Sequence, residues 1–218
     1  MPEFFIEIGS EEIPSGYVQP ALEYMCEELA SFFSSNRIQS EKPQILGTPR
    51  RLVVSVKGVD ALQEDSVDLF HGPNISVAFD DKGEPTKAAI GFARGKGLDV
   101  SSLTRESTPK GEVVCARVEK KGRPTLEHLN EFLPQFIGNI PFPKKMRWGS
   151  KTHPFARPLH WITAIFDGKP LQFSFDGIAC GDFSLGHRFL KPDKFQVKNL
   201  SSYMEQSANH YLMVDPEL

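Results

Sequence analysis

Cysteine, long apolar runs and, near the amino terminus, positive charge are all scarce in this chain. Its three cysteines, Cys26, Cys115 and Cys180, form no CxxC pair and have no histidine at metal-ligand spacing. This argues against a structural zinc site and a disulfide framework, and is typical of free thiols in a reducing cytoplasm. No apolar run reaches the roughly 18–20 residues that span a bilayer, and the amino terminus does not resemble a signal peptide. We therefore expect a cytoplasmic protein with no membrane partner.

Catalytic signatures are missing as well. The chain contains no GxxxxGK[ST] phosphate loop, no GxGxxG, no HExxH and no GxSxG. The glycines of residues 91–97 follow an expected helix, which favours a helix cap and a turn over a phosphate cradle. His153, His160 and His187 show no ligand spacing. We therefore predict no catalytic residue, no metal ligand and no cofactor within this chain.

Three glutamates near the amino terminus admit two interpretations. Glu7, Glu11 and Glu12 could hold Mg²⁺ through their oxygen atoms. Carboxylates at the start of a helix, which complement the helix dipole, are the favoured alternative. Because Glu7 falls within an expected strand, it can also pair with a basic residue such as Arg50 or Arg51.

Charge is unevenly distributed along the 218 residues, although the net charge is only −3. No Lys or Arg precedes Arg37, whereas seven glutamates do. Between residues 141 and 191, eight Lys and Arg residues face only three Asp residues. An acidic first element and a basic last third could therefore present one face that repels phosphate and one that attracts it.

The densest basic segment is residues 142–149, with the sequence FPKKMRWG. It places Lys144, Lys145 and Arg147 next to the indole of Trp148. Cations beside a flat aromatic surface suit a polyanion whose bases can stack, so RNA is the first partner to test. A basic loop whose Trp148 only fills the core explains the same residues, and composition does not separate the two readings.

The apolar periodicity predicts an α+β fold with a mixed or antiparallel sheet and flanking helices. Strands are expected at 4–8, 52–56, 74–79, 112–119, 161–166 and 171–175, and helices at 17–34, 85–94 and 126–137. We expect a main α+β domain formed by residues 1–65 and 141–200. Residues 66–140 would form an inserted or second α+β subdomain, and residues 201–218 would begin a following, truncated region.

Several short motifs follow one another along the chain: FIEIGSEEIP (5–14), TPRRL (48–52), HGP (71–73), PTKAAIGFAR (85–94), FPKKMRWG (142–149), FARP (155–158) with Trp161, and GHRF (186–189). With these motifs the chain resembles the beta subunit of bacterial glycyl-tRNA synthetase. They occur in the family's order across nearly the whole chain. Phe5 stands where the family usually has Val or Leu, and the family's beta subunit is several times longer, with later helical and anticodon-binding regions that are not present here.

The resemblance implies an α2β2 enzyme that attaches glycine to tRNA(Gly) using ATP. It implies that ATP and Mg are bound by the alpha subunit, that the beta subunit handles tRNA, and that this chain has no catalytic site of its own. It also implies a fold similar to the B3/B4 domain of the phenylalanyl enzyme. The implied partners are the glycyl-tRNA synthetase alpha subunit, tRNA(Gly) and the rest of the beta subunit.

Three functions follow from this reading. The leading hypothesis is a module for tRNA handling and assembly, with RNA-binding residues Lys144, Lys145, Arg147, Trp148, Arg157 and Arg188. A structural docking module without RNA contact is the second, and an editing-like hydrolase is the third. Phosphate contacts supply affinity without sequence choice, so glycine identity would be read elsewhere.

Overall fold

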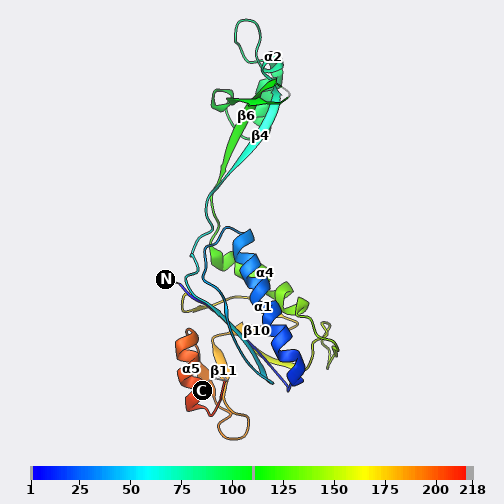
Figure 1. Ribbon diagram of the computed structural model, residues 1–218, viewed down its shortest axis with the longest axis vertical. Helices are drawn as coiled ribbons and strands as arrows, with labels where there is room; N and C mark the ends of the chain where they lie inside the picture. The colour runs from blue at the N-terminus through cyan, green and yellow to red at the C-terminus, as the bar shows by residue number, and fades with distance from the viewer. Residues whose placement is uncertain (1, 110, 215–218) are drawn as a thin grey trace. The chain divides into compact units, whose positions relative to one another are not determined.

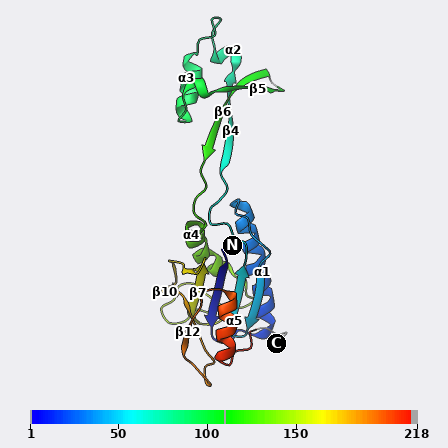
Figure 2. The ribbon, with the colours of Figure 1, turned by 90° about the vertical axis from the view of Figure 1, so that its left-hand side faces the viewer.

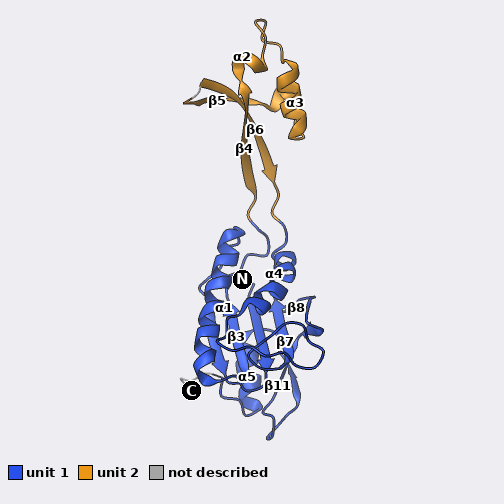
Figure 3. Ribbon diagram, turned by 90° about the vertical axis from the view of Figure 1, so that its right-hand side faces the viewer, with its two compact units in different colours: residues 1–63, 123–218 blue, residues 64–122 orange. Residues whose placement is uncertain are grey.

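The computed structural model describes residues 2–109 and 111–214. The chain divides into two compact units (Figure 3). Unit 1 comprises Met1–Gln63 and Arg123–Leu218, and unit 2 comprises Glu64–Gly122. Unit 2 is thus inserted between the two halves of unit 1. Among the described residues, no helix is both long enough and apolar enough to cross a bilayer.

Unit 1 is built on a seven-stranded sheet (Figures 1 and 2). The strand order is β2-β3-β1-β7-β10-β9, with β8 also paired to β7. The strands are β1 (Phe4–Ser10), β2 (Gln44–Thr48), β3 (Arg51–Val56), β7 (Leu159–Phe166), β8 (Lys169–Pro170), β9 (Ser174–Phe175) and β10 (Ile178–Gly181). β10 runs parallel to β7, and the other described pairs are antiparallel. The predicted α+β class with a mixed sheet is confirmed.

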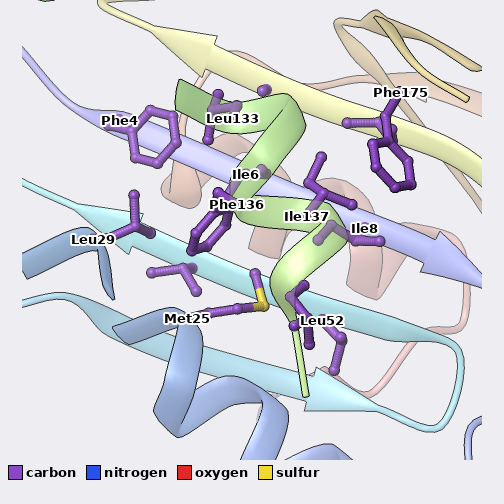
Figure 4. Close-up of a cluster of buried hydrophobic side chains, with 14 of the residues drawn as sticks. Phe4, Ile6, Ile8, Met25, Leu29, Leu52, Leu133, Phe136, Ile137 and Phe175 are labelled. Carbon is purple, nitrogen blue, oxygen red and sulfur yellow. The ribbon is translucent and has the colours of Figure 1, made fainter. Parts of the chain in front are cut away.

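One face of this sheet carries the main hydrophobic core. Phe4, Ile6 and Ile8 of β1 are fully or almost fully buried on this face, because every second side chain of a strand points the same way. Two helices cover the face, α1 (Ser15–Ser35) and α4 (Thr125–Asn139), as Figure 4 shows. Apolar residues at helical spacing, such as Met25 and Leu29 of α1, make this contact.

Both long helices contain an internal proline. Pro20 is the sixth residue of α1, and Pro134 is the tenth residue of α4. Each proline removes one backbone hydrogen bond from its helix. Both helices nevertheless run continuously, since their apolar faces pack on the sheet.

The opposite face of the sheet is covered by the carboxy-terminal part of unit 1. There β11 (Phe183–Leu185) pairs with β12 (Lys194–Gln196), and α5 (Leu200–Asn209) follows. Phe5 of β1 packs against Tyr203 of α5, with ring centroids 5.0 Å apart. Asn199 caps α5 by accepting a hydrogen bond from the Ser202 amide.

Unit 2 is a three-stranded antiparallel sheet with helices on one face. Its strands, in the order β4-β6-β5, are β4 (Ser66–Asn74), β6 (Gly111–Lys120) and β5 (Thr104–Thr108). Its helices are α2 (Ile75–Ala78), α3 (Lys87–Gly95) and the 3-10 turn η1 (Val100–Ser102). A small core of Ala78, Ala89 and Val114 joins α2 and α3 to β6. Thr86 caps α3 by accepting a hydrogen bond from the Ala88 amide.

The unit boundaries differ from the predicted domains at two places. The predicted inserted segment, residues 66–140, included α4, but Leu129 and Leu133 of α4 are fully buried in the main core of unit 1. The predicted following region, residues 201–218, included most of α5, but Tyr203 is fully buried against the main sheet. Both helices belong to unit 1 because their apolar faces are buried against its sheet. Residues 215–218 lie outside the described residues.

Candidate nucleic-acid interface

The basic segment lies in the irregular stretch between α4 and β7, and the core fixes it at two points. Phe142 and Phe155 are both buried, and their ring centroids lie 4.7 Å apart in an edge-on contact. The Met146 amide donates to the Phe155 carbonyl at 2.8 Å, and the Phe155 amide donates to the Met146 carbonyl at 3.1 Å. These contacts hold Phe142 and Met146 against Phe155, and the side chains of Lys144, Lys145 and Arg147 remain at the surface.

The three cations of this segment are exposed. Among the described residues, no carboxylate lies within salt-bridge distance of the Lys144, Lys145 or Arg147 side chain. The Lys145 ammonium sits 5.9 Å from the centroid of the Phe142 ring. Partial desolvation at this position lowers the pKa of Lys145. The positive charges of the segment are therefore available to an external anion.

Trp148 is half-buried and packs against the main core. Its carbonyl accepts a hydrogen bond from the Lys151 amide at 3.1 Å. The indole therefore anchors the segment with part of its surface. The remaining exposed part is the area that a stacked base could cover.

Asp176 holds residues 151–153, which follow the segment, a role that sequence reasoning missed. Its carboxylate accepts hydrogen bonds from the backbone amides of Thr152 and His153 at 3.0 and 3.1 Å, and its carbonyl accepts one from Lys151 Nζ at 2.6 Å. Partial desolvation raises the pKa of Asp176, but these amide bonds outweigh it and hold the pKa below its usual value. The Asp-Gly turn at 176–177, with both residues at positive φ, was the available signal.

Arg157 and Arg188 lie outside this exposed cluster. Arg157 is half-buried and donates to the carbonyl of its neighbour Ala156 at 3.0 Å. Arg188 is exposed, but its Nη1 lies 3.6 Å from a Glu11 oxygen and 3.5 Å from a Glu12 oxygen. Of the six predicted RNA-binding residues, the chain thus groups four in the 144–148 segment, while Arg188 is already paired with acids.

Glu11 and Glu12 pair with Arg188 and with other basic groups. Glu11 binds His160 at 2.9 Å and lies 3.9 Å from Arg50. Desolvation lowers the pKa of Arg50, although Glu11 opposes this effect. A pocket of about 340 Å³ lies beside this cluster, lined by residues including Thr48, Arg50, Phe189 and Met213.

Glu7 is committed to a buried network and does not join Glu11 and Glu12. Glu7 Oε1 accepts from Arg51 Nη1 at 2.7 Å and from the Tyr203 hydroxyl at 2.9 Å, and Oε2 accepts from Trp161 Nε1 at 2.9 Å. The Arg51 guanidinium also lies 4.9 Å from the Trp161 ring centroid. The predicted pairing of Glu7 with Arg50 or Arg51 is confirmed for Arg51.

Position 9 makes this network possible. Gly9 pairs with both Arg51 and Trp161 across the sheet, so the three positions share one face. A Cβ at position 9 would overlap the Trp161 indole. Glycine therefore lets the indole lie flat over β1 and reach Glu7 with its N–H.

Two of the three cysteine thiols, those of Cys115 and Cys180, are poorly suited to act as nucleophiles. Burial raises the pKa of Cys180 to about 11. Burial, followed by a hydrogen bond to Glu106, raises the pKa of Cys115. Both groups are therefore protonated near neutral pH, whereas the thiolate is the reactive form.

Comparison with known proteins relates the whole chain to one family. The family model of the glycyl-tRNA synthetase beta subunit matches residues 4–218. The glycine–tRNA ligase beta subunit of Geobacter metallireducens is 47% identical over 217 residues, which is 100% of this chain and 32% of that protein. The corresponding subunit of Citrifermentans bemidjiense is 49% identical over 214 residues, which is 98% of this chain and 31% of that protein. The chain thus spans about a third of the length of these relatives.

Proposed function

The chain belongs to the glycyl-tRNA synthetase beta-subunit family, and from this premise we propose that it serves tRNA handling and assembly in an α2β2 glycine–tRNA ligase. In this proposal the complete enzyme joins glycine to tRNA(Gly) with ATP. The alpha subunit supplies the site for ATP and Mg, and the present chain supplies no catalytic group. Its partners are the alpha subunit, tRNA(Gly) and the rest of the beta subunit.

The observation that carries the tRNA contact is that Lys144, Lys145 and Arg147 are exposed on an anchored segment and have no acid partner among the residues that the structure describes. Surface lysines usually lose side-chain entropy when they bind a phosphate. Here the backbone between Phe142 and Phe155 is already fixed by a buried aromatic pair and two hydrogen bonds. Binding therefore orders only the side chains, which preserves more of the phosphate interaction energy.

The number of phosphates contacted sets the expected salt dependence. Each neutralised phosphate contributes about −0.7 to −0.9 to the slope of log affinity against log salt concentration. Three contacts, one each for Lys144, Lys145 and Arg147, give a slope between about −2 and −3. Arg188 is left out of this count, because a phosphate would first have to displace Glu11 and Glu12.

The test is a titration of the chain with tRNA(Gly) at several salt concentrations, beside a Lys144→Ala/Lys145→Ala/Arg147→Ala variant. A matched control, Lys42→Ala/Lys57→Ala/Lys198→Ala, removes the same charge from three other exposed lysines of unit 1. We expect the first variant to lose most of the affinity and slope, and the control to keep both. Equal losses of affinity in the two variants would show that the effect comes from net charge and not from the 144–148 segment. A folded wild-type chain whose tRNA affinity does not change with salt would contradict the tRNA contact.

Assembly is the second part of the proposal, and a separate surface supports it. Phe189, Leu190, Tyr211 and Met213 are large apolar side chains that are each more than 60% exposed. Three of them line the same pocket, beside Arg188. Exposed apolar clusters of this kind suit a protein partner better than phosphate.

This surface gives a distinct test. With the complete beta subunit, Phe189→Ser/Met213→Ser should weaken association with the alpha subunit, measured by analytical ultracentrifugation. The same change should leave the salt slope for tRNA binding unaltered. Unchanged assembly would remove this surface from the proposal without affecting the role of the 144–148 segment.

A further inference from the structure

Three side chains with metal-binding atoms meet on the small sheet of unit 2. His71 lies on β4, Cys115 on β6 and Glu106 on β5. His71 is the direct cross-strand partner of Cys115, and Thr104, two residues before Glu106, is the partner of Cys115 on the other side. Since side chains alternate along a strand, all three residues face the same side of the sheet.

This side is the one that the helices leave uncovered. Val114 packs against α2 and α3, and a Cβ at Gly72 would meet both Val114 and Phe92 of α3. Cys115 follows Val114 in the strand and therefore points to the other side. It is only 1% exposed there, although His71 and Glu106 are exposed. The thiol is thus buried beneath an imidazole and a carboxylate.

The three ligand atoms are close enough for one ion. His71 Nε2 lies 3.0 Å from Glu106 Oε2, and all three atoms lie within 4.8 Å of one another. Tetrahedral zinc with bonds of about 2.0–2.3 Å places its ligand atoms about 3.3–3.6 Å apart. The exposed His71 and Glu106 side chains need to move by only about 1 Å to reach this geometry.

We propose that His71, Glu106 and Cys115 form a binding site for Zn²⁺ or a similar borderline-soft divalent ion. One sulfur, one nitrogen and one oxygen ligand favour Zn²⁺ over Mg²⁺ and Ca²⁺, which take oxygen ligands. Because the His71 and Glu106 sides are open to solvent, water fills the fourth position. This site is independent of the proposed tRNA contact, and it departs from the sequence prediction that the chain holds no metal.

Binding exchanges a proton for the metal. In the metal-free chain the Cys115 sulfur lies within 4.8 Å of the His71 and Glu106 ligand atoms, which contact each other at 3.0 Å. The metal takes the sulfur as thiolate, and the thiol proton passes to solvent, so one proton is released per ion bound. Burial raises the pKa of the free thiol, which opposes binding. A coordinated metal overcomes this cost because it deprotonates its thiol ligand.

The test uses the whole 218-residue chain after treatment with a chelator. Co²⁺ is added first, because a cobalt–thiolate bond gives a charge-transfer absorption band, and Zn²⁺ is then titrated to displace it. We expect one Co²⁺ per chain and loss of the band in Cys115→Ser. His71→Ala and Glu106→Gln change exposed side chains, so they preserve the fold and should weaken Zn²⁺ binding. The expected loss of Zn²⁺ affinity is larger than the roughly 10–100-fold loss that follows when a residue that only hydrogen-bonds to a metal ligand is removed.

The two other cysteines supply the matched control. Cys26→Ser/Cys180→Ser removes the remaining thiols of the chain and should leave the cobalt band and the Zn²⁺ affinity unchanged. No charge-transfer band with the folded wild-type chain would overturn the proposal. So would a band that persists in Cys115→Ser, or Zn²⁺ affinities in His71→Ala and Glu106→Gln equal to that of the wild type.

Discussion

Glu7→Gln is the substitution that most directly tests how the main sheet is held to the carboxy-terminal part of unit 1. The wild-type Glu7 carboxylate lies 2.7 Å from Arg51 Nη1, with 0% and 3% of the two side chains exposed. Glutamine keeps the size of the side chain and removes its charge. The Arg51 guanidinium would then remain buried without a counter-ion.

The expected loss of stability follows from two contacts of Glu7, its ion pair with Arg51 and its hydrogen bond with Trp161. Removing one partner of a buried ion pair costs about 3–5 kcal/mol. Arg51 keeps hydrogen bonds to Ser184 Oγ and the Leu185 carbonyl, which places the cost near the lower end of that range. Glutamine has one acceptor oxygen where the carboxylate has two. With that oxygen on the side of Arg51 and Tyr203, its NH2 group faces the Trp161 N–H, which loses its acceptor at a further cost of about 1–3 kcal/mol. We expect Glu7→Gln to lower the free energy of unfolding by at least about 4 kcal/mol.

Urea unfolding followed by tryptophan emission measures this loss for unit 1 alone. Both tryptophans, Trp148 and Trp161, lie in unit 1, so separate unfolding of unit 2 does not affect the signal. With a slope of about 2 kcal/mol per M, the midpoint should fall by roughly 2 M. Glu11→Gln is the matched control, because its 36%-exposed carboxylate makes only surface pairs, worth less than about 1 kcal/mol. Equal midpoints for the two variants would refute the reasoning.

Two further predictions concern the same unit. Gly9→Ala should lower the urea midpoint by an amount that corresponds to at least about 1–3 kcal/mol, because its Cβ overlaps the Trp161 indole; an unchanged midpoint would show that the indole can move aside. The lowered pKa of Asp176 means that its contribution to stability is present above the unfolded-state pKa and is lost as the pH falls through the folded-state pKa. The amide proton shifts of Thr152 and His153 should therefore titrate with a midpoint below about 3.9, the ordinary value for Asp, and should lose this titration in Asp176→Asn; a midpoint above that value would contradict the amide contacts.

The elements that the sequence predicted well are those whose apolar residues keep a regular period. β1, β3, β7, α1 and α4 are of this kind, since each buries one face or both against the main core. β4 was missed because Val67 and Leu69 remain exposed and the strand is defined by its long-range pairing with β6. Residues 74–79 were predicted as a strand, but they form mainly the short helix α2. A short run of apolar residues fits a single helical turn as well as a strand, so the sequence pattern could not separate the two.

Long-range register explains what the sequence could not predict about the sites. The sequence offered Glu7 either Arg50 or Arg51 as a partner, and only the antiparallel pairing of β1 with β3 selects Arg51. The metal-binding triad is spread over residues 71, 106 and 115, and none of these spacings matches a zinc motif. The ligands meet because the pairing of the three strands places them side by side. This pairing joins distant parts of the chain and cannot be read from any one segment.

Whether a basic side chain can bind phosphate depends on which groups the nearby carboxylates already bind. Asp176 lies beside the basic segment, yet its carboxylate binds the Thr152 and His153 amides, and Lys151 contacts its carbonyl. The acid thereby fixes the backbone that follows the segment without neutralising Lys144 or Arg147. Arg188 shows the opposite arrangement, since Glu11 and Glu12 already balance its charge. Equal numbers of basic residues in two regions therefore do not give equal phosphate affinity, and the salt slope should count only the cations that lack an acid partner.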